Sequence, residues 1–320
     1  MAARIVVTRR IPEPAVELLQ AAGDVWVSPH DRPLEAAELH EAVAGADGVV
    51  TLLHDRVDDA FLDAAGPGLR IVANAAVGYD NIDVPACARW GVAVTNTPGV
   101  LTEATADLAF ALILMATRRL GEGERLIRAQ TPWSWSMFFM LGTGIQGKTL
   151  GIVGLGKIGQ ATARRARAFG MEIAYAVRRR ASAEVEAELE ARFVPLEELL
   201  AIADVVSLHC PLSAETHHLI DAAALGRMKP SAFLVNTTRG PVVDEGALAA
   251  ALGAGAISGA GLDVFEREPE VHPDVLGLEN VVLVPHLGSA TVETRTAMGV
   301  LAARNVVAVL GGDAPLTPVV

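Results

Sequence analysis

Three glycines in the stretch GIVGLGKIG, residues 151–159, have the spacing of a phosphate-binding loop. Gly154, Gly156 and Gly159 follow the apolar run TLGIV and precede the helical pattern QATARRARAFG. Glycines let the backbone turn tightly and approach a pyrophosphate, whose charge then lies at the amino end of the helix. A glycine turn of packing value alone is the alternative. Because a strand precedes the loop and a helix follows it, dinucleotide binding is favoured.

The next apolar run ends in cations where this motif ordinarily has an acid. Residues 172–180 read EIAYAVRRR, so that Val177 is followed by Arg178, Arg179 and Arg180. An acid at this point would bind the ribose hydroxyls of NAD and repel a 2′-phosphate, whereas arginines bind phosphate through charge-assisted hydrogen bonds. A solvated basic loop is the alternative. Since the run coincides with the missing acid, we expect NADP(H) to be preferred, with NAD(H) as the second choice.

Ionisable residues follow several later apolar runs. Arg239 follows AFLVNTT, Asp263 follows SGAGL, Glu268 comes shortly after, and His286 follows NVVLVP. A single histidine after a strand is more often structural than catalytic. A histidine, carboxylates and an arginine that all follow strands form a combination that favours catalysis.

The elements that must position these residues alternate between short Val/Ile-rich strands and helices, which indicates parallel α/β sheets. One series begins at RIVVT, residues 4–8, and a second begins at KTLGIVGLGKIG, residues 148–159. A chain of 320 residues is long enough for two domains. We therefore predict an α/β protein of two domains, each a doubly wound parallel-sheet unit of the Rossmann-like or flavodoxin-like kind.

Composition excludes several other classes of function. The 26 basic and 38 acidic residues give a net charge of −12, which disfavours a general nucleic-acid binder. The most apolar run, residues 109–116, is too short to cross a bilayer, and the amino terminus lacks the pattern of a secretory signal, so we expect a cytoplasmic protein. Cys87 and Cys210 read as reduced core residues. His217 and His218 are adjacent and cannot pair on one helix face, and we predict no metal site.

Several segments resemble, in order, the signature segments of the D-2-hydroxyacid dehydrogenase family. They are VGYDNID, NTPGVLTEATADLA, GIVGLGKIG, LVNTTRGPVVDEGAL, GAGLDVFEREP and PHLGSAT, between about residues 70 and 295. PHLGSATVETR together with the arginine-bearing loop looks most like the glyoxylate/hydroxypyruvate reductase branch. The resemblance implies an enzyme that reduces a small 2-keto acid to the D-2-hydroxy acid by hydride transfer, preferring NADPH.

The same resemblance implies that Arg239, Glu268 and His286 form the catalytic set. His286 as imidazolium can protonate the keto oxygen, Glu268 can orient its ring, and Arg239 can hold the substrate carboxylate. Asp263 resembles the family residue that bonds the nicotinamide amide. The residues assigned to the cofactor are Gly154, Leu155, Gly156, Lys157, Ile158, Gly159, Arg178, Arg179, Arg180, Cys210, Pro211, Thr237, Thr238, Arg239, Asp263, His286, Gly288 and Thr102.

Substrate contacts are assigned to Leu53, Val77, Gly78 and Arg239, with the backbone N–H groups of Val77 and Gly78 on the carboxylate. An ordinary glycine turn and a core leucine are the alternatives for the 77–78 pair and for Leu53. The aromatic segment around Trp135 reads as core or dimer packing. By resemblance Trp135 would reach the active site of a partner subunit.

The family arrangement implies a discontinuous substrate-binding domain, residues 1–97 with 289–320, and an NAD(P)-binding domain, residues 98–288. A homodimer is expected, without nucleic-acid or membrane partners. Two alternatives stay open at this point. One is a dehydrogenase of phosphoglycerate, lactate or a larger D-2-hydroxy acid that uses NAD. The other is a non-catalytic nucleotide-sensing protein of the same fold.

Overall fold

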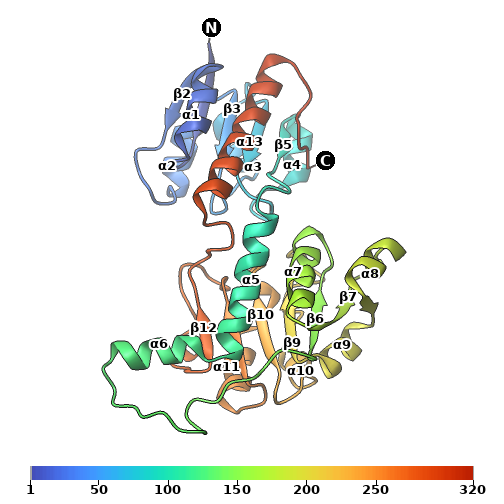
Figure 1. The fold of residues 1–320 in the computed structure, drawn as a ribbon. Coiled ribbons are helices and arrows are strands. Elements are labelled where there is room, and N and C mark those ends of the chain that lie inside the picture. Colours follow the sequence, from blue (N-terminus) through green and yellow to red (C-terminus); the bar gives the residue numbers. More distant parts are fainter. Residues whose placement is uncertain (1, 320) are drawn as a thin grey trace. The chain divides into compact units, whose positions relative to one another are not determined.

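The computed structural model describes residues 2–319 and divides into two compact units (Figure 1). One unit comprises the residues up to Leu101 together with those from Ala290 onward, and the other is Thr102–Ser289. Each unit contains a single sheet in which every pairing is parallel, with helices on both faces. The predicted α/β class with two parallel-sheet units is therefore confirmed.

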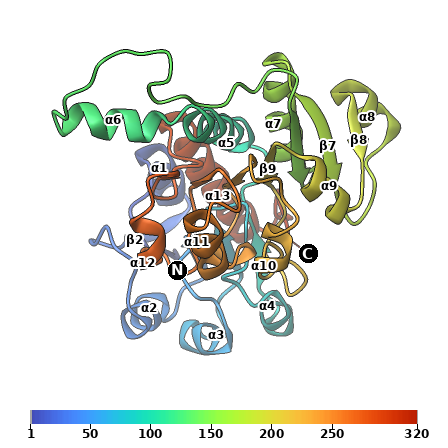
Figure 2. The same cartoon turned by 90° about the horizontal axis from the view of Figure 1, so that it is seen from below.

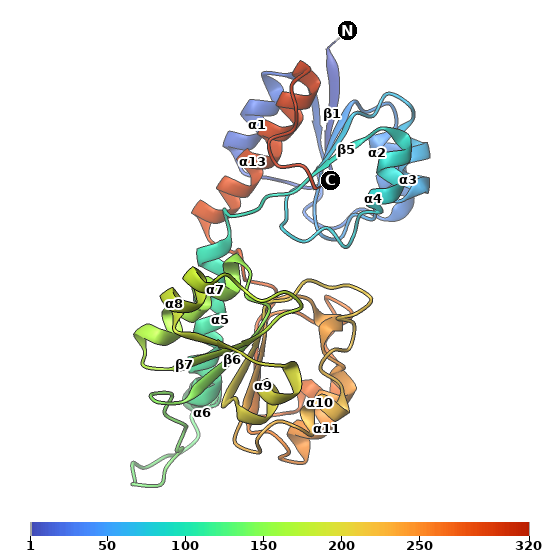
Figure 3. The same cartoon turned by 90° about the vertical axis from the view of Figure 1, so that its right-hand side faces the viewer.

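The first unit is built on a five-stranded sheet of order β2-β1-β3-β4-β5. Its strands are β1 (Ala3–Val7), β2 (Gly23–Val27), β3 (Gly48–Thr51), β4 (Ile71–Asn74) and β5 (Ala93–Thr95). Its helices are α1 (Glu13–Gln20), α2 (Ala36–Val43), α3 (Asp59–Ala65), α4 (Val84–Trp90) and α13 (Val292–Gly311). Helices α1 and α13 pack on one face and α2, α3 and α4 on the other (Figure 3).

The second unit is built on a seven-stranded sheet of order β12-β11-β10-β9-β6-β7-β8. Its strands are β6 (Thr149–Val153), β7 (Glu172–Ala176), β8 (Ala191–Phe193), β9 (Val205–Leu208), β10 (Phe233–Asn236), β11 (Gly259–Leu262) and β12 (Val281–Leu283). The helices are α5 (Thr102–Thr117), α6 (Leu120–Arg128), α7 (Lys157–Ala168), α8 (Ala183–Leu189), α9 (Leu196–Ile202), α10 (Ala222–Leu225), η1 (Gly240–Val242), α11 (Glu245–Gly253) and α12 (Pro273–Leu276).

The strand order of this second sheet reverses at β6, which has β7 on one side and β9 on the other. Ligands of open parallel sheets bind outside the carboxyl ends of the strands at such a reversal. The loop after β6 is the glycine loop, and the loops after β9, β10, β11 and β12 open at the same edge because all the strands are parallel. The topology therefore gathers the predicted site residues of this unit at one edge of its sheet.

Inner strands of both sheets, such as β3, β4, β9 and β10, are fully buried, as expected when helices cover both faces of a parallel sheet, whereas the edge strands β2 and β8 are partly exposed. Helix α5 carries the apolar run of residues 109–116, and Phe110, Leu112 and Ile113 are buried in the core of the second unit, as predicted. Cys87 and Cys210 are free and buried, also as predicted. Among residues 2–319 no helix is both long and apolar enough to cross a membrane.

Candidate active site

The glycine loop between β6 and α7 has three glycines with different surroundings. Gly154 has a φ of +98°, and a Cβ built on it would lie 2.6 Å from the carbonyl carbon of His209. A Cβ on Gly159 would lie 2.3 Å from the carbonyl oxygen of Gly154. Gly156 is exposed and has no atom within 4 Å of such a Cβ. The protein therefore requires glycine at the first and third positions, whereas the room beside the second suits an approaching pyrophosphate.

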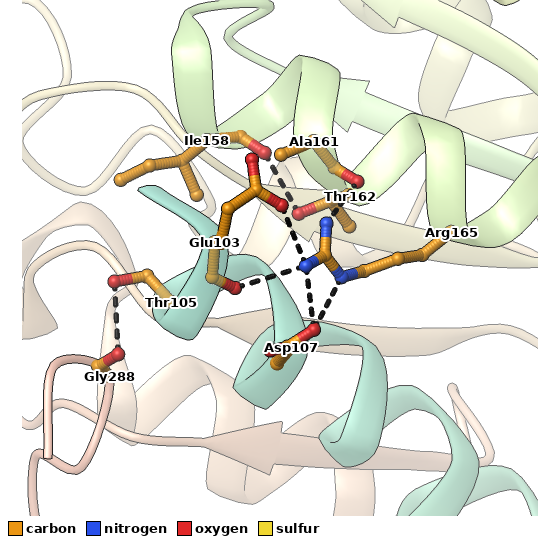
Figure 4. A network of polar contacts seen from close by, with 8 residues as sticks. All are labelled: Glu103, Thr105, Asp107, Ile158, Ala161, Thr162, Arg165 and Gly288. Carbon is orange, nitrogen blue, oxygen red and sulfur yellow. Dashed lines mark hydrogen bonds and ion pairs between the residues drawn. The ribbon is translucent and has the colours of Figure 1, made fainter. Parts of the chain in front are cut away.

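Helix α7, which begins at this loop, is anchored by Arg165 (Figure 4). Arg165 pairs with Glu103 at 2.8 Å and with Asp107 at 2.6 Å, both on α5. Close by, Thr105 Oγ1 donates to the carbonyl oxygen of Gly288 at 3.0 Å. The first turns of α5 are thus ion-paired with the helix that follows the glycine loop and hydrogen-bonded to the turn after His286. Gly288 was among the residues predicted to bind the cofactor. Sequence reasoning missed the other four, Glu103, Thr105, Asp107 and Arg165, because their partners are 58 to 183 positions away.

The three arginines after β7 differ in their surroundings. Arg180 donates from Nε and Nη2 to both carboxylate oxygens of Glu186, at 2.7 and 2.8 Å. The Arg180 guanidinium and the hydroxyl of Tyr175 lower the pKa of Glu186 to about 2, so this partner is ionised at neutral pH. Within the described part of the chain, no hydrogen bond or ion pair holds the guanidinium of Arg178 or Arg179, and both are exposed. Arg178 and Arg179 are therefore the available cations at this strand end.

The loop after β9 brings His209 and Cys210 against the glycine loop. Their backbone atoms are the ones that a side chain at Gly154 would strike. Burial raises the pKa of the Cys210 thiol to about 11, so it is protonated and no nucleophile. Burial also lowers the pKa of His209 to about 4, and its Nε2 lies 2.9 Å from Ser207 Oγ. Both side chains are neutral, and they shape this wall of the site without adding charge.

His286 and Glu268 meet although they follow different strands. His286 Nδ1 lies 2.8 Å from Glu268 Oε2, and the other carboxylate oxygen of Glu268 accepts from the N–H of Phe265 at 3.2 Å. His286 has a φ of 51°, a conformation that a non-glycine residue adopts only when its surroundings hold it. Its N–H donates to the carbonyl oxygen of Asp263 at 2.8 Å. The pairing fixes the ring and directs Nε2 away from Glu268.

Asp263 is engaged with the turn that carries His286. Its carboxylate accepts from the N–H groups of Leu287 at 2.5 Å and Gly288 at 2.9 Å. Burial raises the pKa of Asp263, while these two bonds and the nearby His286 act in the opposite direction. The sequence-based expectation for Asp263 was a bond to the nicotinamide amide. In the structure Asp263 holds the turn after β12, and the bond to the nicotinamide stays a prediction.

The loop after β10 places Arg239 next to the loop that carries Glu268. Asn236 braces it, since its Nδ2 donates to the carbonyl oxygen of Arg239 at 2.9 Å and its Oδ1 accepts from Thr238. Arg239 is half-buried, and its Nη1 donates to the carbonyl oxygen of Thr238 at 2.9 Å. Thr237 is buried beside them. The loops after β10, β11 and β12 therefore bring together the predicted catalytic set at the edge of one sheet.

In the first unit, asparagines brace the two loops assigned to the substrate. Asn96 donates to the carbonyl oxygen of Val77 at 2.8 Å, and Asn74 donates to that of Gly78 at 2.9 Å. Asn81 bridges the 77–83 loop to the one after β3 by donating to the carbonyl oxygen of Leu52 at 3.1 Å, next to the half-buried Leu53. These asparagines were missed from sequence, where an Asn at a strand end reads as an ordinary loop residue.

The aromatic segment after α6 does not belong to the core of the chain. Trp135 is 75% exposed and Phe138 is 85% exposed, while Trp133 stacks on Phe139 with ring centroids 5.8 Å apart. Helix α6 has no buried residue, and the segment after it extends away from the sheet of its unit (Figures 1 and 2). Of the two interpretations, core packing within the chain is wrong. Packing against a partner stays a prediction.

Metal ligands do not cluster in the described residues: nowhere in residues 2–319 do three or more His, Cys, Asp or Glu side chains form a group that could hold an ion.

Comparison with known proteins places this site in a family. A family model described as D-isomer specific 2-hydroxyacid dehydrogenase, NAD binding domain, matches residues 110–288. Glyoxylate reductase from Thermococcus onnurineus is 48% identical over 322 residues, which cover 99% of this chain and 96% of that protein. A crystal structure of the TT0316 protein from Thermus thermophilus is 44% identical, with a TM-score of 0.92 over 99% of this chain and 100% of that one.

A further solved structure is NADPH-dependent glyoxylate/hydroxypyruvate reductase from Sinorhizobium meliloti in complex with NADP and malonate. It is 36% identical, with a TM-score of 0.85 over 100% of this chain and 97% of that one. The fold and the site together define an NAD(P)-dependent oxidoreductase with two parallel-sheet units. The chain belongs to the D-isomer specific 2-hydroxyacid dehydrogenase family, as the sequence motifs predicted. Its reaction is accordingly the interconversion of a 2-keto acid and a 2-hydroxy acid with a nicotinamide cofactor.

Proposed function

We propose that the protein reduces glyoxylate or hydroxypyruvate to the D-2-hydroxy acid with NADPH as the preferred cofactor. The observation that carries this proposal is the 2.8 Å pairing of His286 with Glu268 at the sheet edge that also presents the glycine loop. The names of the relatives support the substrate class, since glyoxylate reductases are about half identical to this chain over nearly its whole length.

His286 is the general acid in this proposal. An ionised carboxylate can only accept hydrogen bonds, so Glu268 accepts from Nδ1–H and leaves Nε2 for the substrate. When bound, NADPH supplies a hydride to the carbonyl carbon. As the C=O double bond becomes a single bond, its oxygen takes the proton from Nε2–H, and the ring is left neutral. The contact with Glu268 fixes the orientation of the His286 ring.

Arg239 and the first unit bind the substrate. The guanidinium of Arg239 offers paired donors to a carboxylate and to the keto oxygen, on which negative charge grows during hydride transfer. We assign the N–H groups of Val77 and Gly78 to the substrate carboxylate because Asn96 and Asn74 hold the carbonyl oxygens of these two residues. Leu53 would contact the carbon chain. In this assignment the first unit is the substrate-binding domain and the second is the nucleotide-binding domain.

The preference for NADPH rests on the strand end after β7. A half-buried Val177 stands where an acid would repel a 2′-phosphate, and the exposed Arg178 and Arg179 offer guanidinium groups. Arg180 contributes less in this proposal, since Glu186 accepts two of its donors. The space beside Gly156 and the amino end of α7 suit the pyrophosphate shared by both cofactors.

We also propose that the protein is a homodimer built through the segment after α6. A monomer would leave Trp133, Trp135 and Phe138 in water at between 55% and 85% exposure, together with Met137 and Leu141. A contiguous exposed apolar segment of this kind marks an interface. A second copy of the chain is the partner, and Trp135 is the residue assigned to the substrate site of that copy.

The test is a panel of 2-keto acids assayed by the consumption of NADPH and of NADH. We expect the highest kcat/KM with glyoxylate or hydroxypyruvate together with NADPH. A higher value with NADH and phosphohydroxypyruvate, pyruvate or a larger keto acid would reassign the substrate within the family. No turnover of any 2-keto acid with either cofactor would overturn the enzymatic proposal and leave a nucleotide-binding protein.

A further inference from the structure

The loop that carries Glu268 runs directly against the loop that carries Arg239. A Cβ built on Gly240 would lie 1.8 Å from the carbonyl carbon of Phe265 and 2.3 Å from the nitrogen of Glu266. Gly240 follows Arg239 in the chain, and Glu266 precedes Glu268 by two residues. The two backbones are therefore in contact without side chains between them, and a shift of one loop displaces the other.

His218 is bonded to both loops. Its main-chain N–H donates to the carbonyl oxygen of Pro241 at 2.8 Å, two residues after Arg239. Its ring Nε2 lies 3.0 Å from Glu266 Oε1 and donates to it, since an ionised carboxylate only accepts. His218 also has a φ of 50°, a strained conformation for a non-glycine residue that persists only where its surroundings hold it.

The Glu266 carboxylate lies beside a second acid, Glu245, and the His218 ring supplies it with a hydrogen-bond donor. Glu266 and Glu245 are interlocked: the N–H of Glu266 donates to Glu245 Oε1 at 2.7 Å, and the N–H of Glu245 donates to Glu266 Oε1 at 3.0 Å. Burial raises the pKa of Glu245. Asp244 adds a third carboxylate, whose Oδ2 lies 3.9 Å from His218 Nδ1. Without the His218 ring, Glu266 would still lie beside Glu245 but would lose a hydrogen-bond donor. The position of its carboxylate would then be less well fixed.

We infer that His218 is a positioning residue for the reaction. It holds Glu266, and through Glu266 the 265–268 segment, where Glu268 accepts from the N–H of Phe265 and bonds His286. His218 itself touches neither substrate nor cofactor in this scheme. The role of Glu268 rests on the proposed function, whereas the link between the two loops rests only on the contacts of His218, Gly240 and Glu266 in the structure.

The test compares two substitutions of equal length and similar backbone preference. His218→Gln keeps an N–H donor for Glu266, and His218→Met removes it. We expect His218→Met to lower the single-turnover rate of NADPH oxidation with glyoxylate roughly tenfold while the NADPH dissociation constant changes less than about twofold. His218→Gln should recover most of the rate. His30→Met is the control, because His30 is an exposed histidine of the first unit, away from the loops that carry Arg239 and Glu268, and should leave the rate unchanged.

Two further measurements decide the mechanism. If His218 acts through Glu266, the double variant of His218→Met and Glu266→Gln should lose no more rate than the worse single variant. Amide hydrogen exchange of the 259–270 segment should be faster in His218→Met than in the wild type, and it should return to the wild-type rate in His218→Gln. This measurement does not depend on turnover. Inactivity of the wild type on every keto acid would defeat the proposed function, while the exchange measurement would still decide the link. Equal rates and equal exchange in the Met and Gln variants, or additive losses in the double variant, would overturn the inference.

Discussion

The three arginines after β7 should contribute unequally to NADPH binding, and single substitutions can separate them. Arg178→Ala and Arg179→Ala each remove an exposed guanidinium that no described residue holds. Arg180→Ala removes one that already donates twice to Glu186, at 2.7 and 2.8 Å, and lies over the ring of Phe193 at 5.7 Å. The set is internally controlled, because each variant removes the same charge from neighbouring positions.

The magnitude follows from the kind of bond lost. A hydrogen bond to a charged group contributes about 1.5–3 kcal/mol, and we take the lower end because these side chains are exposed and screened by salt. A loss of about 1.4 kcal/mol is tenfold in a dissociation constant. We therefore expect Arg178→Ala or Arg179→Ala to weaken NADPH binding about tenfold and NADH binding less than about twofold. Arg180→Ala should change the affinity for either cofactor less than about twofold.

The assay is a titration of each variant with NADPH and with NADH by cofactor fluorescence, at low and at moderate salt. The loss in the first two variants should shrink as salt rises, since it comes from charge at a 2′-phosphate. Arg180→Ala removes the contact with Glu186 instead, and the melting temperature of this variant shows whether losing that contact destabilises the protein. The reasoning is refuted if Arg180→Ala weakens NADPH as much as the other two, or if every variant weakens both cofactors equally.

Three other predictions concern the acid, the glycine loop and the dimer. His286→Ala should lower kcat at least about a hundredfold with little change in NADPH affinity, and an unchanged kcat would remove His286 from the acid role. Gly154→Ala should lower both the melting temperature and cofactor affinity, because its Cβ would lie 2.6 Å from the carbonyl carbon of His209. The protein has room for a Cβ at position 156, so Gly156→Ala should leave the melting temperature unchanged and lower only the cofactor affinity. An equal fall in melting temperature in the Gly154→Ala and Gly156→Ala variants would contradict this. The wild type should have the mass of a dimer by light scattering, and Trp135→Ala should raise KM for the keto acid; a monomeric wild type would reject the interface.

Much of the architecture could be read from local sequence patterns. The alternation of apolar strands with helices repeats along the chain, and a parallel sheet follows from it because its strands are buried on both faces. The glycine loop, the arginine run and each single family segment are likewise local, since each depends on residues within a few positions of one another. The predicted gathering of Arg239, Glu268 and His286 needed one further rule, that parallel strands end at the same edge.

Other features could not be read from any single stretch. Arg180 is set apart from its two neighbours by Glu186, an acid that comes near only when α8 folds back toward the strand end. Asp263 holds the N–H groups of Leu287 and Gly288, which lie more than 20 positions along the chain. The exposure of Trp135 was equally undetermined, because an aromatic residue in a core and one in an interface look alike in sequence.

Local patterns in the sequence were enough to predict the family, the glycine loop and the residues able to do chemistry. Only the folded chain shows how those residues are held: which arginine is already paired, which carboxylate holds a turn, and which histidine bonds both the loop after Arg239 and the loop that carries Glu268. The physical reason is the range of the interactions. Backbone preference and hydrophobic periodicity act between near neighbours in the chain, whereas the hydrogen bonds of His218 and Asp263 join segments that only the fold brings within 3 Å.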